Sequence, residues 1–224
     1  MAKAEDHRVR VARERRDRMR AKLLATVMST AGSLGDRLPT VDDVIRDAKV
    51  SRATFYKYFS SVEEVAYILG NELVDEMAYS LRALLSVPTI PFLQMTAGVQ
   101  LFLMRSVTDP LWAAFVTRTD YISRDTELLK VMKRHLTQCR REGQVHFNDI
   151  ESAVSLFVGA LMEAMRHLVR SGKRKRAYVE ELSVMILLGL GVERALAVKT
   201  VRERAQFIRD LAPERLPWWR DPWD

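Results

Sequence analysis

The sequence of 224 residues contains few residues that interrupt helices and almost no cysteine. It holds nine glycines, seven prolines and one cysteine, Cys139, whereas apolar residues make up 48% of the chain. A single cysteine excludes an internal disulfide framework and fits a reducing cytosol. The apolar content is sufficient for a packed core, and the scarcity of helix breakers favours an all-α protein.

The sequence also lacks the features of exported and membrane-inserted proteins. The charged N-terminus has no apolar segment of the kind found in signal peptides, so we expect none. The longest apolar run, 185–192, is far shorter than the roughly 20 residues that a membrane span needs. We therefore expect a cytoplasmic protein without a membrane partner.

The motifs of the common enzyme classes are absent as well. The sequence has no G-x-S-x-G, P-loop, G-x-G-x-x-G or H-E-x-x-H motif and no paired cysteines. His135 and His167 lie on predicted helices without a second ligand at metal spacing. We expect no catalytic residues, no metal site and no cofactor. The alternative is a helical enzyme whose catalytic residues are scattered along the chain.

Basic charge is concentrated at the N-terminal end. Residues 1–60 hold 14 Lys and Arg against 8 Asp and Glu, a net charge of +6, whereas residues 61–224 hold 22 against 21. A basic surface that is merely solvated does not require this segregation. The charge distribution therefore predicts a polyanionic partner of the N-terminal part.

The stretch from Thr40 to Phe59, TVDDVIRDAKVSRATFYKYF, has the pattern of two short helices joined by a tight turn. Thr40 caps the first helix, with Asp43 completing a capping box, and Ser51 caps the second. One face of the first helix is apolar, through Val41, Val44, Ile45 and Ala48. In the second helix Phe55 and Phe59 are expected inside, and the outward side chains are Arg52, Thr54, Tyr56, Lys57 and Tyr58. The stretch is typical of a helix-turn-helix, whose second helix enters the DNA major groove.

We expect two domains, residues 1–60 and 61–224. Residues before about Arg13 are interpreted as a flexible basic arm that follows DNA, with a solubilising tail as the alternative. Ser61 and Glu64 predict the start of a long helix that reaches about Leu85. Apolar periodicity and capping residues predict further helices at about 91–106, 110–121, 124–141, 149–171, 175–198 and 200–211.

The predicted helices 149–171 and 175–198 carry apolar residues on more than one face. Such helices must be covered on several sides. We predict that two of them from each of two subunits form a four-helix dimer interface. The alternative is that both are core helices of a monomer. The predicted interface residues are Phe157, Ala160, Met185, Gly189, Val192 and Leu196.

The segment V-S-R-A-T-F-Y-K-Y-F-S-S-x-E-E-V resembles the tetracycline-repressor (TetR) family of bacterial transcription regulators. Direct resemblance covers about residues 20–70. It implies an all-α fold with an N-terminal three-helix helix-turn-helix domain and a larger C-terminal helical bundle for ligand binding and dimerisation. It also implies a homodimer on double-stranded DNA with a palindromic operator.

The resemblance implies DNA contacts from Thr40, Ser51, Arg52, Ala53, Thr54, Tyr56, Lys57 and Tyr58. Arg52 is expected to read a base edge, and Tyr56, Lys57 and Tyr58 to bind the backbone. For Tyr56 and Tyr58 the alternative is partial core packing. Two positions depart from the family: Val62 stands where lysine is frequent and Ala53 where glycine is frequent.

The resemblance further implies a small-molecule effector bound by the second domain. Aromatic and methionine side chains suit an apolar ligand. The predicted ligand residues are Phe92, Met95, Phe102, Arg105, Trp112, Phe115, Phe157, Met162 and Met165, with Tyr121 in the same inventory. Plain core packing is the alternative for each of them. Arg105 is expected to pair either with an acidic ligand group or with Asp109.

The C-terminal tail carries Trp218, Trp219 and Trp223, which are costly to leave in water. We predict that the tail folds back onto the second domain or onto a partner subunit. Taken together, the residues and the resemblance predict a homodimeric repressor that an apolar small molecule releases from its operator. The alternatives are a ligand-responsive activator, a DNA-binding protein without an effector, and a regulator that acts on another protein.

Overall fold

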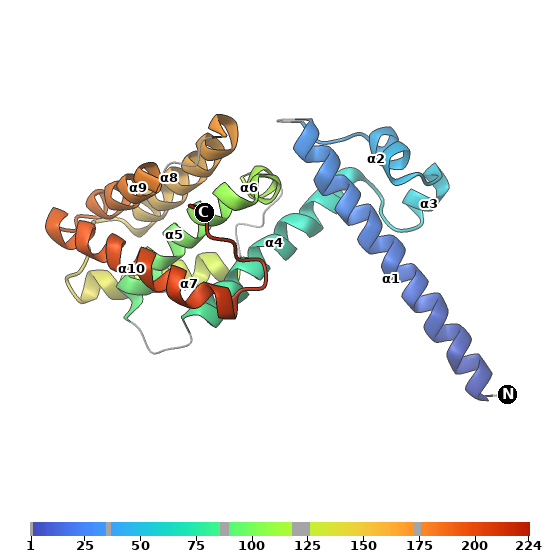
Figure 1. Cartoon of the computed structure of the whole chain (residues 1–224), viewed down its shortest axis with the longest axis horizontal. Coiled ribbons are helices and arrows are strands. Elements are labelled where there is room, and N and C mark those ends of the chain that lie inside the picture. Colours follow the sequence, from blue (N-terminus) through green and yellow to red (C-terminus); the bar gives the residue numbers. More distant parts are fainter. Residues whose placement is uncertain (1, 35–36, 86–89, 118–125, 173–175) are drawn as a thin grey trace. The chain divides into compact units, whose positions relative to one another are not determined.

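The computed structural model describes residues 2–34, 37–85, 90–117, 126–172 and 176–224. In these ranges it is all-α, with ten helices and no strand, as predicted (Figure 1). The chain forms two compact units, Met1–Asn71 and Glu72–Asp224. The predicted domain boundary at residue 60 separates the same helices except for α4 (Val62–Leu84). In the structure the boundary between the two units lies within α4, after Asn71.

The first unit contains α1 (Ala2–Ser33), α2 (Val41–Ala48), α3 (Arg52–Tyr56) and the beginning of α4. Its core is a continuous apolar cluster that excludes water almost completely. The cluster consists of Leu23, Leu24, Val27, Ala31, Val44, Ala48, Phe55, Phe59, Val62, Val65 and Ala66. The short helices α2 and α3 therefore depend on packing rather than on their own propensity.

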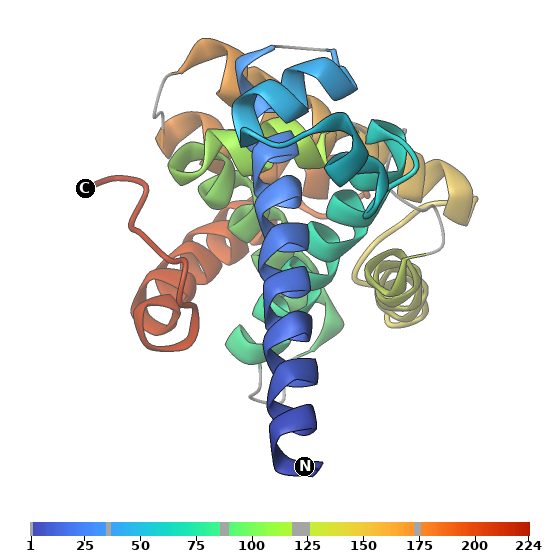
Figure 2. The same cartoon turned by 90° about the vertical axis from the view of Figure 1, so that its right-hand side faces the viewer.

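The predicted flexible arm is wrong, because α1 is one continuous helix from Ala2 (Figure 2). Its first half is rich in alanine, arginine and glutamate, which have high helix propensity. An ion pair at i, i+4 between Arg10 and Glu14, 3.8 Å long, adds local support.

The predicted caps of the helix-turn-helix are present. Thr40 and Asp43 form the complete capping box of α2, and Lys49 ends that helix in the left-handed conformation with φ 52°. The Ser51 hydroxyl accepts a hydrogen bond from the Thr54 amide at 3.0 Å. At the start of α4 the box is only partly as predicted, because Glu64 accepts from the amide and hydroxyl of Ser60 rather than from Ser61.

The second unit is built around α5 (Pro91–Thr108), which is buried almost continuously from Met95 to Val107. The helices packed against α5 are α6 (Pro110–Val116), α7 (Glu127–Arg141), α8 (Ile150–Ser171), α9 (Arg176–Gly189) and α10 (Arg194–Arg215). The predicted Asp109 cap of α6 is present. The predicted start of α8 at Asn148 is wrong by one residue, because the Asp149 carboxylate caps the helix through the Ser152 amide.

The predicted helix 175–198 is wrong, because two helices, α9 and α10, replace it. Gly191 lies between them at φ 79°, a left-handed conformation that ends α9. A Cβ at this position would lie 2.8 Å from that of His146, so a close backbone approach also requires glycine here. Glu193 then caps α10 through the amides of Ala195 and Leu196. The predicted short helix 200–211 is part of α10.

The tail folds back onto the second unit, as predicted. The indole of Trp218 donates a hydrogen bond to the Ser80 hydroxyl at 2.9 Å and lies over the guanidinium of Arg105. Trp219 and Trp223 are half-buried and Pro222 is buried. The tail therefore covers the end of α4 that belongs to the second unit.

In the described part of the chain, α8 alone is long and apolar enough to cross a membrane by length and composition. One such helix is weak evidence, because the core helix of a globular domain passes the same test. One side of α8 lies in the core, through Ala153, Phe157, Leu161, Ala164, Met165 and Leu168.

Candidate DNA-binding surface and ligand pocket

Two phenylalanines fix α3 to the first unit. Phe55 is 0% exposed and Phe59 is 2% exposed, and both belong to the core of that unit. Because α3 is a short helix, its buried residues determine which side chains face outward. Except for Thr40, which caps α2, the predicted DNA-contact residues belong to α3 or directly flank it. Thr40, Ser51, Arg52, Ala53, Tyr56 and Lys57 are exposed, and Thr54 and Tyr58 are half-buried.

Tyr56 is 51% exposed, although its ring packs edge-on against Phe55 with a centroid distance of 5.6 Å. The ring is thus positioned by the core while its outer half stays in water. Val62, the departure from the family lysine, is 3% exposed and belongs to the core. This position therefore presents no side chain to DNA.

The Arg52 guanidinium is held by the Asp42 carboxylate of α2, with a nitrogen-to-oxygen distance of 2.5 Å. The hydrogen bond to Asp42 raises the pKa of Arg52, so the side chain carries its charge at every physiological pH. Both groups are largely exposed, which leaves the pair accessible to an incoming anion.

The N-terminus of α2 is occupied by its own carboxylate. The Thr40 amide and hydroxyl both donate to Asp43, at 2.9 and 2.8 Å. These hydrogen bonds lower the pKa of Asp43 to about 2. Thr40 is exposed, but a phosphate at this helix end has to share donors with Asp43.

The second unit contains a cavity of about 780 Å³ between α4, α5, α7 and α8. This volume is within the range of small-molecule sites. Four predicted ligand residues line it: Met95, Phe102, Phe157 and Met162. The sequence reasoning missed two sides of the cavity. These sides are the α4 residues Val74, Ala78 and Leu81 and the α7 residues Leu128, Val131, Met132 and His135.

The other five predicted ligand residues are buried away from this cavity. They are Phe92, Arg105, Trp112, Phe115 and Met165, and none of them is among its lining residues. They fill the packed interior of the unit, and their role in binding a ligand stays a prediction. Tyr121 lies outside the described residues.

Arg105 does not pair with Asp109, the partner predicted for it within the chain. Its guanidinium donates to the Glu76 carboxylate at 2.8 Å and lies between the rings of Trp112 and Trp218, each centroid 4.4 Å away. Asp109 is used elsewhere, because its carboxylate accepts from the Trp112 amide at 3.0 Å. The Arg105 side chain is 5% exposed. It is a structural cation that joins α4, α6 and the tail.

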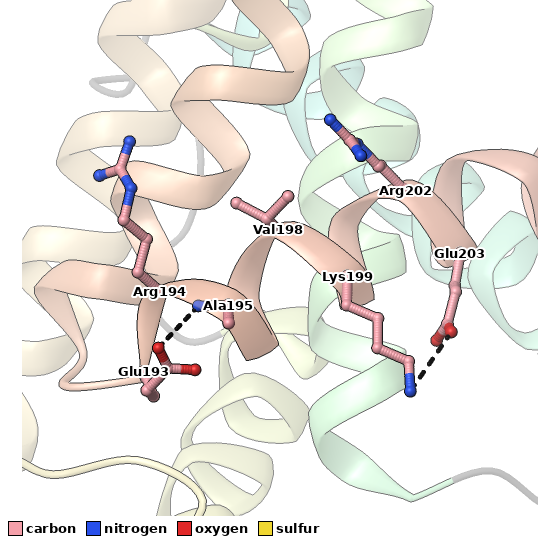
Figure 3. A pocket seen from close by; sticks show the side chains of 7 residues that line it. All are labelled: Glu193, Arg194, Ala195, Val198, Lys199, Arg202 and Glu203. Atoms are coloured by element: carbon pink, nitrogen blue, oxygen red, sulfur yellow. Dashed lines mark hydrogen bonds and ion pairs between the residues drawn. The ribbon is translucent and has the colours of Figure 1, made fainter.

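A second, shallow hollow lies along the first turns of α10 (Figure 3). All its lining residues come from this helix and its N-cap. The Glu193 carboxylate binds the Ala195 amide, and Lys199 pairs with Glu203 at 3.9 Å. The hollow is therefore a charged helix surface rather than a ligand site.

The predicted dimer residues fall into two groups. Met185 is 57% exposed, Gly189 is exposed and Ala160 is half-buried, all on α8 or α9. At Gly189 the two helices are close, because an added Cβ would lie 2.9 Å from Leu156. Phe157 and Val192 are only 5% exposed. Leu196 is exposed on α10 and not, as predicted, on the helix of Met185.

No protein-family model and no curated protein matches this sequence. Solved structures match most of the chain. RolR bound to resorcinol is 17% identical, with 84% of this chain and 95% of RolR covered and a TM-score of 0.62. A putative TetR-family regulator from Shewanella sp. PV-4 is 18% identical, with 76% and 96% covered and a TM-score of 0.64.

A γ-butyrolactone receptor described as ArpA-like is 15% identical, with 85% of this chain and 99% of the receptor covered and a TM-score of 0.60. The fold is therefore that of a class of helical transcription regulators that carry a helix-turn-helix. In particular, the chain has the fold of the TetR-family regulators.

Proposed function

We propose that this protein is a sequence-specific, DNA-binding transcriptional regulator. The observation that carries the proposal is the orientation of α3, whose phenylalanines are in the core while Arg52, Tyr56 and Lys57 are exposed. The net charge of +6 on residues 1–60 supports a phosphate-rich partner. The same proposal places the protein in the cytoplasm.

In this proposal Arg52 reads a base edge in the major groove, most favourably a guanine. Ser51, Ala53 and Thr54 face the same groove, and Tyr56, Lys57, Tyr58 and Thr40 bind the phosphate backbone. Arg52 has to leave Asp42 or share its donors with it when it reaches a base. Sequence choice therefore comes from the first turn of α3, and most of the affinity comes from the basic surroundings.

The protein acts as a homodimer through α8 and α9. The exposed apolar residues Leu156 and Met185, together with the glycine at 189, form a face that suits close packing of two helix pairs. The apolar composition of α8 has a direct explanation in such an interface. A dimer presents two copies of α3 to two half-sites of a palindromic operator, about 34–36 Å apart.

The cavity of the second unit binds an apolar effector that opposes DNA binding. Its lining is dominated by aliphatic, methionine and phenylalanine side chains. RolR was solved with resorcinol, and another match is a γ-butyrolactone receptor, so small organic ligands occur among proteins of this fold. Because α4 lines the cavity and also begins in the first unit, the effector acts on the helix that follows the helix-turn-helix in the chain.

The direct test is a gel shift of the full chain against the promoter beside its own gene. Arg52→Ala is expected to lower the preference for the specific site by about 1–3 kcal/mol, whereas Lys57→Ala weakens all DNA alike. Arg202→Ala, on the exposed surface of α10, is the control and leaves binding unchanged. Absence of binding to any fragment at low salt would refute the proposal. A reporter gene then distinguishes repression from the alternative, activation.

A further inference from the structure

The charged side chains that line the cavity already have partners within the described part of the chain. The Lys133 ammonium binds both oxygens of the Glu151 carboxylate, at 2.8 and 3.0 Å. The Glu127 carboxylate accepts from Arg134 at 3.0 Å. The Arg82 guanidinium lies over the ring of Tyr79, 4.5 Å from its centroid. Lys133, Glu151 and Glu127 are therefore each paired with an opposite charge before any ligand enters, whereas Arg82 lies over an aromatic ring.

The remaining polar side chains of the lining are uncharged. Gln94 of α5, Ser155 of α8 and the imidazole of His135 on α7 offer hydrogen-bond donors and acceptors. Burial and the neighbouring Arg134 lower the pKa of His135, so its ring is neutral at physiological pH. The Thr126 hydroxyl is used in capping α7.

A charged ligand would meet an unfavourable environment in this cavity. A carboxylate that approaches Lys133 comes next to the Glu151 carboxylate, and the two anions repel each other. An ammonium group has the same difficulty with Glu151, because Lys133 already compensates that charge. A charged group that enters an apolar cavity without a partner loses its hydration, and few favourable interactions in the cavity offset that free-energy cost. A neutral ligand needs only the hydrogen-bonding groups that are present.

We infer, on the basis of the proposed function, that the effector is an uncharged, largely apolar molecule, such as an alcohol, phenol, ester or lactone. Its polar group hydrogen-bonds to His135 or Gln94, and the Lys133–Glu151 pair acts as a specificity determinant that excludes the corresponding carboxylic acid. The selectivity for the uncharged molecule over the acid therefore depends on the pairing of Lys133 with Glu151 and not on the size of the cavity.

The test uses three probes with the same alkyl chain, decan-1-ol, methyl decanoate and decanoate, each below its micelle concentration. Binding to the full-length protein is measured by isothermal titration calorimetry. The alcohol and the ester are expected to bind at least tenfold more tightly than the acid. Glu151→Gln releases Lys133 and is expected to raise the affinity for the acid at least tenfold relative to the affinity for the alcohol.

Two further variants serve as controls. Glu203→Gln makes the same chemical change in an ion pair with Lys199 on α10, away from the cavity, and is expected to leave the affinity for all three probes unchanged. Combining Lys133→Met with Glu151→Gln is expected to abolish the gain for the acid. These controls show whether Lys133 itself is the cation that accepts the carboxylate.

Tighter binding of decanoate than of the alcohol to the unaltered protein would overturn the inference and leave the proposed function intact. The same holds if Glu151→Gln does not improve binding of the acid relative to the alcohol. If DNA binds but no probe does, the inference and the effector part of the proposed function both fail. If the alcohol binds and no DNA fragment does, the inference stands and the proposed function fails.

Discussion

Truncation of Trp218 to alanine is the most informative perturbation of the tail. The Trp218 ring covers one face of the Arg105 guanidinium at 4.4 Å, while Trp112 covers the other and Glu76 neutralises the charge. The Trp218 indole also donates to Ser80 at 2.9 Å. The variant removes these contacts together and opens one side of a buried cation to water.

The expected loss follows from three contributions. A partly desolvated cation–π contact is worth about 1–2 kcal/mol, and the hydrogen bond to Ser80 about 1 kcal/mol. Removing roughly 100 Å² of buried apolar surface, as expected for a half-buried indole, costs on the order of 2.5 kcal/mol at about 25 cal/mol per Å². Because contributions at one site are not additive, we expect Trp218→Ala to lower the free energy of unfolding by about 3 kcal/mol.

The assay is urea denaturation followed by far-UV circular dichroism, which does not depend on tryptophan fluorescence. Trp219→Ala is the comparison, because Trp219 is also half-buried and its ring lies against that of Trp218, with 6.3 Å between the centroids, whereas the contacts to Arg105 and Ser80 come from Trp218. It is expected to lose about 1 kcal/mol. Trp218→Phe keeps an aromatic face and is expected to lose about 1 kcal/mol as well. Equal losses for Trp218→Ala and Trp219→Ala would refute the role assigned to the Arg105 sandwich.

Three further predictions concern the interface, a turn and the helix-turn-helix. Met185→Glu is expected to convert the proposed dimer to a monomer in analytical ultracentrifugation. Leu111→Glu, at another exposed apolar position, on α6, is expected to leave the dimer intact. An unchanged sedimentation coefficient for Met185→Glu would place the interface elsewhere. Gly191→Ala is expected to lower the free energy of unfolding by about 2 kcal/mol, because φ is 79° and the new Cβ meets His146. Gly172→Ala, where the new Cβ has no atom within 4 Å, is expected to lower it by about 1 kcal/mol in the same urea assay. The pKa of Asp43 is about 2 in the folded protein and 3.8 ordinarily, so its contribution to stability is present above pH 4 and is lost as the pH falls towards 2. The free energy of unfolding of Asp43→Asn is therefore expected to change less between pH 4 and pH 2 than that of the unaltered protein. Identical pH dependence of the two proteins would contradict the contribution of this cap.

Short-range features were predictable from the sequence. The caps at Thr40, Ser51 and Asp109 join residues three positions apart, so their hydrogen bonds depend on local conformation alone. The inward position of Phe55 and Phe59 also followed from helical periodicity. For the same reason the flexible arm was a poor prediction, because local propensity along α1 already favoured a helix.

Long-range features were decided only by the tertiary structure. Arg105 has Asp109 one helical turn away, yet it pairs with Glu76, 29 positions earlier in the chain, because the tertiary packing brings Glu76 of α4 to its guanidinium while Asp109 caps α6. Likewise, which residues of α4 and α7 line the cavity depends on how these helices are rotated against α5. The sequence by itself thus determined most of the helices, the caps of α2, α3 and α6 and the outward side of α3, which arise from interactions within a few residues. Packing between distant segments decided the partner of each buried charge and the walls of the cavity, since those depend on contacts that no local pattern encodes.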